Sequence, residues 1–279
     1  MIAAASLNDL KRRRPEWQPW LAVVGEVLGE AEGSRWDAMV PPRTHEQGPR
    51  APLLAAPSIK MESRPVRHLF ARLVRVAKRG QTAKMANLDA SAISDVDLGR
   101  LFHASVWHDH DVVARIAASA GMDGEALAAI VALLPVPFLH ACQRRWASTI
   151  RADWIHGYCP LCGSWPAFAE VRGIERTRFF RCGRCGAEWH AQALACPYCA
   201  IEDHRELVSL VPGGGASHAV IEACRPCRGY VKTFTTLQGC PPARVMVEDL
   251  ASVDLDLAAL AHGYARPNGA GYDPLALHT

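Results

Sequence analysis

The sequence lacks the features of a membrane-spanning or secreted protein. Its most apolar run, residues 126–142, is too short to span a bilayer and is interrupted by Pro135 and Pro137. The N-terminal residues do not show the basic stretch followed by an apolar stretch that marks an export signal. We therefore expect a cytoplasmic protein with no membrane segment.

The composition also excludes disordered and fibrous proteins. Only 21% of the 279 residues are charged and 49% are hydrophobic, whereas disordered chains are rich in charge and poor in apolar residues. A chain of this length and composition has enough apolar residues for a sizeable core. The length predicts about two domains.

Cysteine is nearly absent from the first half of the chain and concentrated in the second half. Of the 10 cysteines, all except Cys142 lie between Cys159 and Cys240. Because thiols are kept reduced in the cytoplasm, such clustering favours metal binding over disulfides. Cys142 itself is expected to be a small core residue.

Residues 1–155 show helical periodicity, which predicts an all-α bundle. The expected helices cover residues 15–32, 65–79, 94–106, 111–120, 124–134 and 136–150. Ser94 and Asp123 are the expected N-caps, and Gly121 is an expected C-cap. Prolines recur through residues 39–65, which indicates an extended loop.

No residue of the helical half indicates catalysis. His108-Asp109-His110 lies between two expected helices, and side chains two apart do not face each other on a helix. A solvated turn is therefore favoured over a metal or proton-transfer site. The basic helix at 65–79 is interpreted as a solvated face, with contact to an acidic partner as the alternative.

Eight cysteines form four Cys-x-x-Cys pairs: Cys159/Cys162, Cys182/Cys185, Cys196/Cys199 and Cys224/Cys227. Each pair is typical of a zinc-ribbon or rubredoxin knuckle, in which a tight turn brings two thiolates together. The residues between the first two pairs are enough for a hairpin, with strands expected at 166–171 and 177–180. The last two are separated by strands 207–211 and 219–222 and by glycines 213–215, which are expected to form a loose turn.

Sequential pairing is the simplest arrangement of the four knuckles: the first two hold one ion and the last two hold another. A crossed arrangement, first with third and second with fourth, stays open. Four thiolates select zinc or a single iron, and the donor set does not separate the two. His190 is a possible substitute ligand, although four thiolates already close the shell. Cys240 is interpreted as an ordinary cysteine, with a reactive thiol as the alternative.

The formal net charge of +3 is not by itself a sign of nucleic-acid binding. Eight thiolates with two divalent ions would lower the net charge to about −1. The arginines near the knuckles are therefore interpreted partly as compensation for anionic centres, which weakens the phosphate-binding interpretation. They are Arg172, Arg181, Arg184, Arg225 and Arg228.

Motifs around and after the cysteines resemble those of the formate dehydrogenase accessory protein family, FdhE. The runs that carry the resemblance are residues 158–164, 180–189, 196–199, 224–233 and 248–257. The resemblance implies a cytoplasmic protein, required for active formate dehydrogenase, that contacts the molybdenum- or tungsten-containing catalytic subunit before export. It also implies tandem rubredoxin-like modules with iron as the metal and the eight paired cysteines as its ligands. It implies no enzymatic activity of the protein itself.

The sequence therefore predicts an α+β multidomain protein. Its expected parts are a helical domain (1–155), two metal ribbons (156–193 and 194–245) and a C-terminal helix and tail (246–279). The function expected is that of an assembly chaperone for the formate dehydrogenase catalytic subunit. A zinc-ribbon nucleic-acid-binding protein and a rubredoxin-like electron or sulfur carrier are the alternatives.

The partner-binding surface and the oligomeric state stay open at this point, with a homodimer among the alternatives. Trp165, Trp189 and Tyr230 are candidate anchors for a partner, since aromatic residues in small modules often exceed what a core needs. For each of them taken singly, packing in the core is the favoured interpretation.

Overall fold

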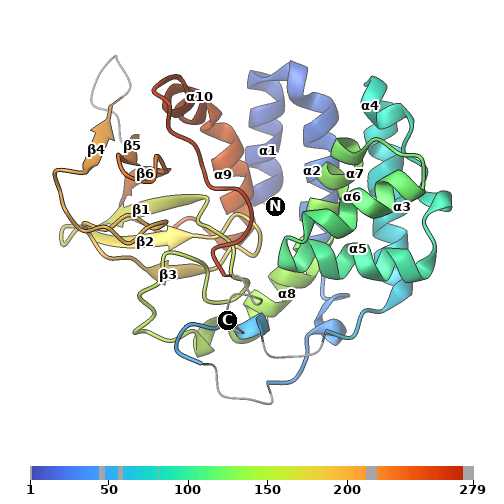
Figure 1. The fold of residues 1–279 in the computed structure, drawn as a ribbon, viewed down its shortest axis with the longest axis horizontal. Coiled ribbons are helices and arrows are strands. Elements are labelled where there is room, and N and C mark those ends of the chain that lie inside the picture. Colours follow the sequence, from blue (N-terminus) through green and yellow to red (C-terminus); the bar gives the residue numbers. More distant parts are fainter. Residues whose placement is uncertain (1, 44–47, 56–58, 81, 212–218, 273–279) are drawn as a thin grey trace. The chain divides into compact units, whose positions relative to one another are not determined.

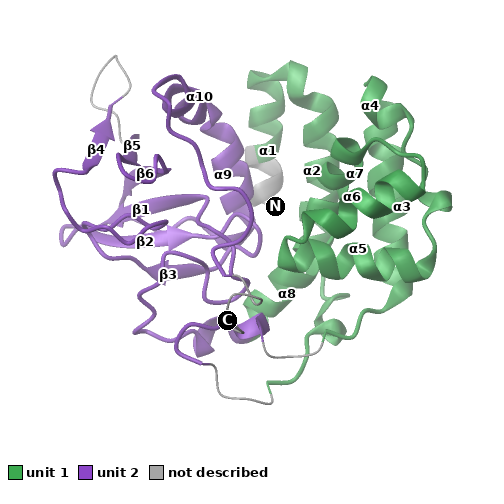
Figure 2. Cartoon of the chain, viewed as in Figure 1, with its two compact units in different colours: residues 1–43, 58–145 green, residues 44–57, 146–279 purple. Residues whose placement is uncertain are grey.

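The structure is a computed structural model, and it describes all residues except 1, 44–47, 56–58, 81, 212–218 and 273–279. The chain forms two compact units: residues 1–43 with 58–145, and residues 44–57 with 146–279 (Figure 2). Parts of the expected proline-rich loop, and the expected turn at glycines 213–215, lie outside the described residues. The boundaries expected for the two ribbons and the tail stay a prediction.

The first unit is helical, as the sequence predicts (Figure 1). Its α-helices are α1 (Ile2–Arg13), α2 (Gln18–Ala31), α3 (Ser63–Arg79), α4 (Ala83–Ala86), α5 (Asp95–Trp107), α6 (His110–Ser119), α7 (Gly124–Leu133) and α8 (Val136–Trp146). Short 3-10 turns lie at Pro15–Trp17, Asp37–Met39 and Ala90–Ala92. Helices α1 and α4 are additions to the predicted set.

The helix ends follow the expected capping chemistry. Ser94 Oγ accepts a hydrogen bond from the N–H of Asp97 at 3.0 Å, which caps α5. Asp123 Oδ1 accepts one from the N–H of Ala126 at 2.9 Å, which caps α7. Gly121 has a φ of +67°, a conformation that glycine adopts without steric cost, just after α6.

The core of the helical unit is built from helices that are neighbours along the chain and from large apolar side chains. Helix α2 packs on α3, α5 on α6, and α6 on α7. The rings of Phe102 and Phe138, both fully buried, meet edge to face with their centroids 5.7 Å apart. Such aromatic pairs contribute packing energy beyond their buried area.

The apolar run near the end of this unit is longer than the sequence suggests. Helical structure continues through Pro135 and Pro137, so residues 124–149 form a stretch of 26 residues whose length and hydropathy would suffice to cross a membrane. Of its most apolar window, 78% is buried inside the structure, as in the core helix of a globular protein. Length and composition are weak evidence for a membrane span in such a case.

The two charged motifs of the helical unit have structural roles. His108, with a φ of 59°, ends α5, and Asp109 Oδ1 accepts the N–H of Val112 at the start of α6. The motif is thus the predicted turn between helices. On α3, Arg67 binds Asp95 and Arg72 binds Glu30, with N–O distances of 2.6 Å in each case. These pairs reduce the positive surface that an acidic partner would meet.

The strands described in the second unit form one six-stranded sheet in the order β3-β2-β1-β6-β5-β4. They are β1 (Phe168–Arg172), β2 (Thr177–Arg181), β3 (Glu188–His190), β4 (Leu207–Leu210), β5 (Ala219–Cys224) and β6 (Tyr230–Thr236). The predicted hairpins are present as the antiparallel pairs β1–β2 and β4–β5. The parallel pair β1–β6, which the sequence did not predict, joins the two ribbons into one sheet.

Two short helices follow the sheet, α9 (Val245–Ala251) and α10 (Val253–Ala261). Helix α10 packs on β5 and β6 through a buried cluster that includes Ile221, Leu255 and Ala259. Val245, at the start of α9, packs with Phe168 of β1. The C-terminal helix expected after residue 246 is therefore a pair of helices anchored to the sheet.

Candidate metal centres

The four Cys-x-x-Cys pairs adopt the same turn. In each, the N–H of the first cysteine donates to a carbonyl five residues later: Cys159 to Ser164 (2.9 Å), Cys182 to Ala187 (2.9 Å), Cys196 to Ile201 (3.0 Å) and Cys224 to Gly229 (2.8 Å). The residue after the second cysteine has a positive φ: 74° at Gly163, 72° at Gly186, 58° at Ala200 and 58° at Arg228. The sequence indicated this conformation at Gly163, whereas Ala200 and Arg228 adopt it at a steric cost.

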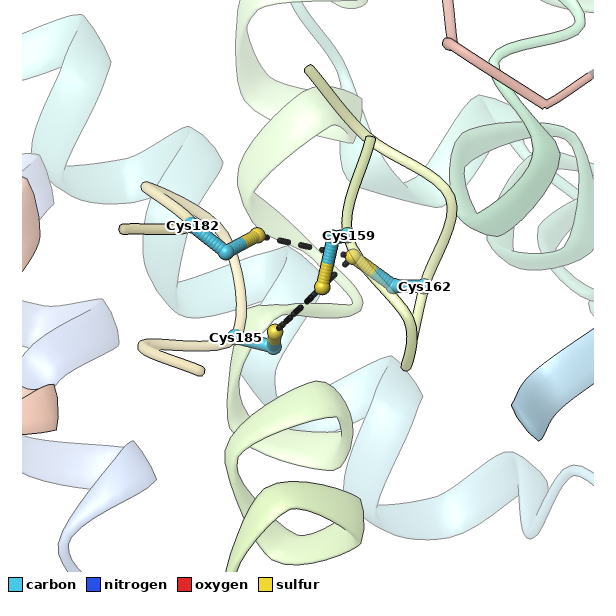
Figure 3. A group of neighbouring side chains, drawn as sticks. All are labelled: Cys159, Cys162, Cys182 and Cys185. Atoms are coloured by element: carbon cyan, nitrogen blue, oxygen red, sulfur yellow. Dashed lines mark hydrogen bonds between the residues drawn. The ribbon is translucent and has the colours of Figure 1, made fainter. Parts of the chain in front are cut away.

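The first two knuckles bring their four sulfur atoms together (Figure 3). The Sγ atoms of Cys159 and Cys185 lie 3.6 Å apart, and those of Cys162 and Cys182 lie 3.5 Å apart. Four sulfurs arranged tetrahedrally at 2.3 Å from a metal ion would lie about 3.8 Å from one another. The donor set and its spacing therefore fit one zinc or one iron.

The last two knuckles form a second group of four sulfurs. The Sγ atoms of Cys196 and Cys227 lie 3.6 Å apart, as do those of Cys199 and Cys224. The N–H of Gly229 points at Cys227 Sγ at 3.4 Å, as backbone groups do around metal-bound thiolates. The cysteines are thus grouped sequentially along the chain, and the crossed arrangement is not the one observed.

The electrostatics of the first group favour an ion at its centre. Burial raises the pKa of Cys159 and Cys185 well above the ordinary value for a thiol. Hydrogen bonds from the neighbouring thiols, that of Cys159 first, lower the pKa of Cys162. Four buried thiolates with no cation between them would repel one another. A divalent cation removes that obstacle by coordinating the deprotonated sulfurs.

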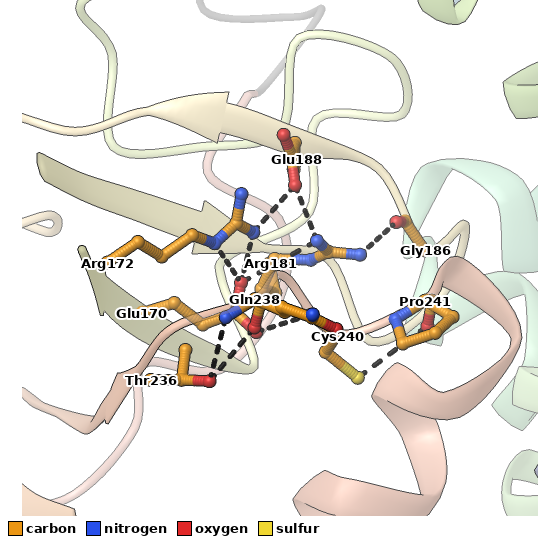
Figure 4. Close-up of polar contacts among 9 residues, drawn as sticks. All are labelled: Glu170, Arg172, Arg181, Gly186, Glu188, Thr236, Gln238, Cys240 and Pro241. Carbon is orange, nitrogen blue, oxygen red and sulfur yellow. Dashed lines mark hydrogen bonds and ion pairs between the residues drawn. The ribbon is translucent and has the colours of Figure 1, made fainter.

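A buried polar network supports the second knuckle (Figure 4). Arg181 is 2% exposed, and its guanidinium donates to Gly186 O at 3.1 Å and to Glu188 Oε2 at 2.6 Å. Glu170 Oε1 accepts the N–H of Cys240 at 2.7 Å. Arg181 also lies 3.6 Å from Glu170 Oε2 of β1, so these contacts tie the turn that carries Cys182 and Cys185 to β1, to β3 and to the loop before α9.

Most arginines near the knuckles have partners other than the sulfurs. Arg172 and Arg181 bind the carboxylates of Glu170 and Glu188. Arg228 donates to the carbonyl of Gly263 at 2.9 Å. Arg184 donates to Ser164 Oγ at 3.3 Å, and its charge also helps to lower the pKa of Cys162. The predicted charge compensation thus fits Arg184, and the paired arginines are poorly placed to bind phosphate.

The remaining candidates from the sequence have ordinary structural places. His190 is exposed on β3 and belongs to neither group of sulfurs. Cys142 is fully buried in α8. Burial raises the pKa of Cys240 to about 12, so its thiol keeps its proton at neutral pH and is not an activated nucleophile.

The candidate aromatic anchors mostly belong to the core. Trp189 and Tyr230 are each 3% exposed, and they hydrogen-bond to His156 O and Asp256 Oδ1, respectively. The favoured interpretation of these two as core residues is therefore confirmed. Trp165 is half-buried and its ring packs edge to face on that of Tyr198, with centroids 5.1 Å apart. That contact links the first ribbon to the third knuckle.

Sequence reasoning missed a second polar network, which anchors α9 and α10 to the sheet. The side chain of Lys232 on β6 is fully buried, and its Nζ lies 2.7 Å from Asp249 Oδ1 and 2.9 Å from Asp256 Oδ2. Arg266 binds the same two carboxylates, at 2.7 and 2.9 Å. Both carboxylates lie in residues 248–257, one of the runs that resemble the family motifs. That run was the feature of the sequence that could have indicated the network.

Comparisons with known proteins confirm the resemblance that the motifs indicate. Residues 158–192, which contain the first group of sulfurs, match the family model described as the FdhE central domain. The chain is 37% identical over 114 residues to an FdhE homolog of Pseudomonas aeruginosa, covering 39% of this chain and 37% of that protein. It is 32% identical over 143 residues to an FdhE homolog of Stutzerimonas stutzeri, covering 47% and 46%, respectively. The matched stretches are thus less than half the length of these relatives.

A solved structure is also similar to this chain. It is the crystal structure of the FdhE protein from Pseudomonas aeruginosa, with 24% sequence identity and a TM-score of 0.45. The alignment covers 88% of this chain and 92% of that one.

Proposed function

From the resemblance of its central part to the FdhE family, we propose that the protein is an accessory protein for formate dehydrogenase. In this proposal it acts in the cytoplasm as an assembly chaperone and binds the molybdenum- or tungsten-containing catalytic subunit. It is not itself an enzyme. The observation that carries the proposal is the match of residues 158–192 to the FdhE central domain, over the knuckles that form the first four-sulfur group.

The eight paired cysteines are proposed as the ligands of two metal ions, one in each group. Such closed four-thiolate sites stabilise small domains, and zinc binding is worth on the order of 10 kcal/mol in isolated peptides. The ions thus fix the turns of the ribbons, and the protein's own residues supply the surface for the partner. Iron, which the resemblance implies, gives a coloured protein, whereas zinc gives a colourless one. Metal analysis and the visible spectrum of protein purified without added metal distinguish them.

The end of the sheet at β1 and β6 offers apolar surface for a partner. Ile174, in the β1–β2 turn, is 99% exposed, and Leu237, just after β6, is 86% exposed. The N–H of Gly173 donates to Thr236 O, which places the two turns next to each other. Large apolar side chains exposed on neighbouring turns are candidates for a binding surface. We include this pair in the contact proposed for the catalytic subunit.

The proposal is tested by complementation. A strain without this protein is expected to lose formate oxidation and to regain it when the wild-type chain is expressed. A chain with both Ile174→Ser and Leu237→Ser should recover less of the catalytic subunit in a pull-down, whereas Val96→Ser, an exposed apolar position of the helical unit, should not. Normal formate oxidation in the deletion strain would overturn the proposal. Salt-dependent retention on a nucleic-acid matrix would favour the nucleic-acid alternative instead.

A further inference from the structure

The two groups of sulfurs differ in their access to solvent. All four cysteines of the first group are buried, with exposed fractions of 0–2%. In the second group Cys196 and Cys224 are buried, but Cys199 and Cys227 are exposed. The two centres therefore have the same donor set and the same turn, but one of them contains two exposed cysteines.

The first group is sealed by segments that come from both ends of the unit. In residues 48–55, the N–H of Leu53 donates to Pro160 O at 2.7 Å and that of Leu54 to Leu161 O at 3.0 Å. From the other end, the N–H groups of Gly271 and Tyr272 both donate to Gly163 O, at 2.8 and 3.2 Å. These segments cover the backbone of the first knuckle, and Leu54 is itself fully buried.

The second group is covered in part: Trp165 packs on Tyr198 of its first knuckle, and the segment after α10 lies against Arg228 of its second. Arg228 donates to the carbonyls after α10, and its guanidinium lies 4.2 Å from the ring centroid of Tyr264. On another side a cavity of about 140 Å³ has Cys196 and Cys224 in its wall. Cys196 and Cys224 therefore line a cavity, while Cys199 and Cys227 are exposed.

From this difference we propose that the second centre is an exchangeable metal site and the first is a permanent one. The proposal rests on the assignment of the eight cysteines as ligands. With an ion bound, Cys199 or Cys227 would give up its bond to the ion, and an incoming thiolate or nitrogen chelator would take its place with its own electron pair. The released thiolate takes a proton from water, and the charge of the ion does not change, so no oxidant or reductant is needed. Because Cys199 and Cys227 are exposed, an incoming ligand would meet them without any opening of the sheet.

The first test is release of zinc from the full chain reconstituted with zinc, in the presence of excess 4-(2-pyridylazo)resorcinol. We expect two phases of one equivalent each, the second at least about tenfold slower because it requires local opening. In parallel, N-ethylmaleimide labelling followed by peptide mapping should show Cys199 and Cys227 modified before the four cysteines of the first group. Release of both equivalents in a single phase, or equal labelling of the two groups, would overturn the proposal.

Substitutions assign each phase to its centre. Cys227→Ser should abolish the fast phase and leave the slow one. Leu54→Ala should accelerate the slow phase and leave the fast one unchanged, because it loosens the cover over the first knuckle. Leu88→Ala, which removes an equally buried leucine from the helical unit, should change neither. A reconstituted chain that holds fewer than two ions would overturn both the assignment of the eight cysteines as ligands and the proposed difference between the two sites. Two ions released together would overturn only the proposed difference.

Discussion

At the scale of single residues, backbone conformation decides which substitutions the knuckles tolerate. Gly186 and Gly173 both have positive φ, 72° and 65°. A Cβ at Gly186 would lie 2.7 Å from the Pro242 carbonyl oxygen, whereas a Cβ at Gly173 would have no atom within 4 Å. The glycine of the second knuckle is thus required by its conformation and by its neighbour.

We predict that Gly186→Ala destabilises the protein more than Gly173→Ala. The Gly173 variant should lose about 1 kcal/mol of unfolding free energy, since only the left-handed backbone is penalised. The Gly186 variant should lose about 1–3 kcal/mol more, because the clash forces the backbone to move. Urea unfolding of the zinc-loaded variants measures both. Equal losses would show that Pro242 does not constrain the knuckle.

The buried charges between β6 and the last helices predict a dependence of stability on pH. Burial raises the pKa of Asp249, but Arg266 and Lys232 lower it by more. The pKa of Asp249 therefore lies below its ordinary value. A carboxyl whose pKa is lower in the folded protein stabilises the fold at pH values above its unfolded pKa of about 3.9. That stabilisation is lost as the pH falls through the folded-state pKa. Asp249→Asn should therefore flatten the decline of the unfolding free energy below about pH 5. Glu175→Gln, at an exposed carboxyl, is the control, and the same decline in both variants would contradict this role.

At the scale of elements, the predictable features were those set by local chemistry. Caps such as Ser94 and Asp123 mark helix starts in the sequence, and the paired cysteines mark the hairpins that carry them. Strand β6 was missed because Lys232 and three threonines make it polar, and the partners that neutralise the lysine lie on α9 and α10. The covering segment 48–55 was missed for a similar reason: it binds the first knuckle through backbone N–H groups, which leave no pattern in the side chains.

The caps supply a prediction at this scale. Asp123→Ala should cost about 1 kcal/mol of unfolding free energy, because the N–H of Ala126 loses its acceptor. Thr82, the N-cap of α4, makes no such side-chain hydrogen bond, so Thr82→Ala should cost little. Thermal unfolding of the two variants compares them directly. A larger loss at Thr82 would contradict the capping assignment.

At the scale of the whole molecule, the two units depend on different forces. The helical unit is held by apolar packing, whereas the ribbons place eight cysteines where two ions would hold the turns. The sequence indicated metal-held turns in the second unit because nine of the ten cysteines lie between Cys159 and Cys240. It did not predict that β1 and β6 pair, since a parallel pairing between distant strands depends on the folded arrangement of both ribbons.

Removal of the ions is expected to unfold the ribbons selectively. After treatment with a strong chelator, hydrogen exchange should become fast in β1, β2 and the knuckles, because the structural sites no longer contribute to folding. Amides of α2, α3 and α5 should stay protected by their own core. Loss of protection throughout both units at the same rate would show that the helical unit depends on the metal sites.

Native mass spectrometry tests most directly whether the two four-sulfur groups hold metal. The wild-type chain is expected to carry two ions, and a chain with Cys196→Ser and Cys199→Ser is expected to carry one. Cys142→Ala with Cys240→Ser, at the cysteines outside both groups, should leave two. A wild-type chain that carries no ion, or whose mass shows the eight cysteines joined as disulfides, would contradict the account.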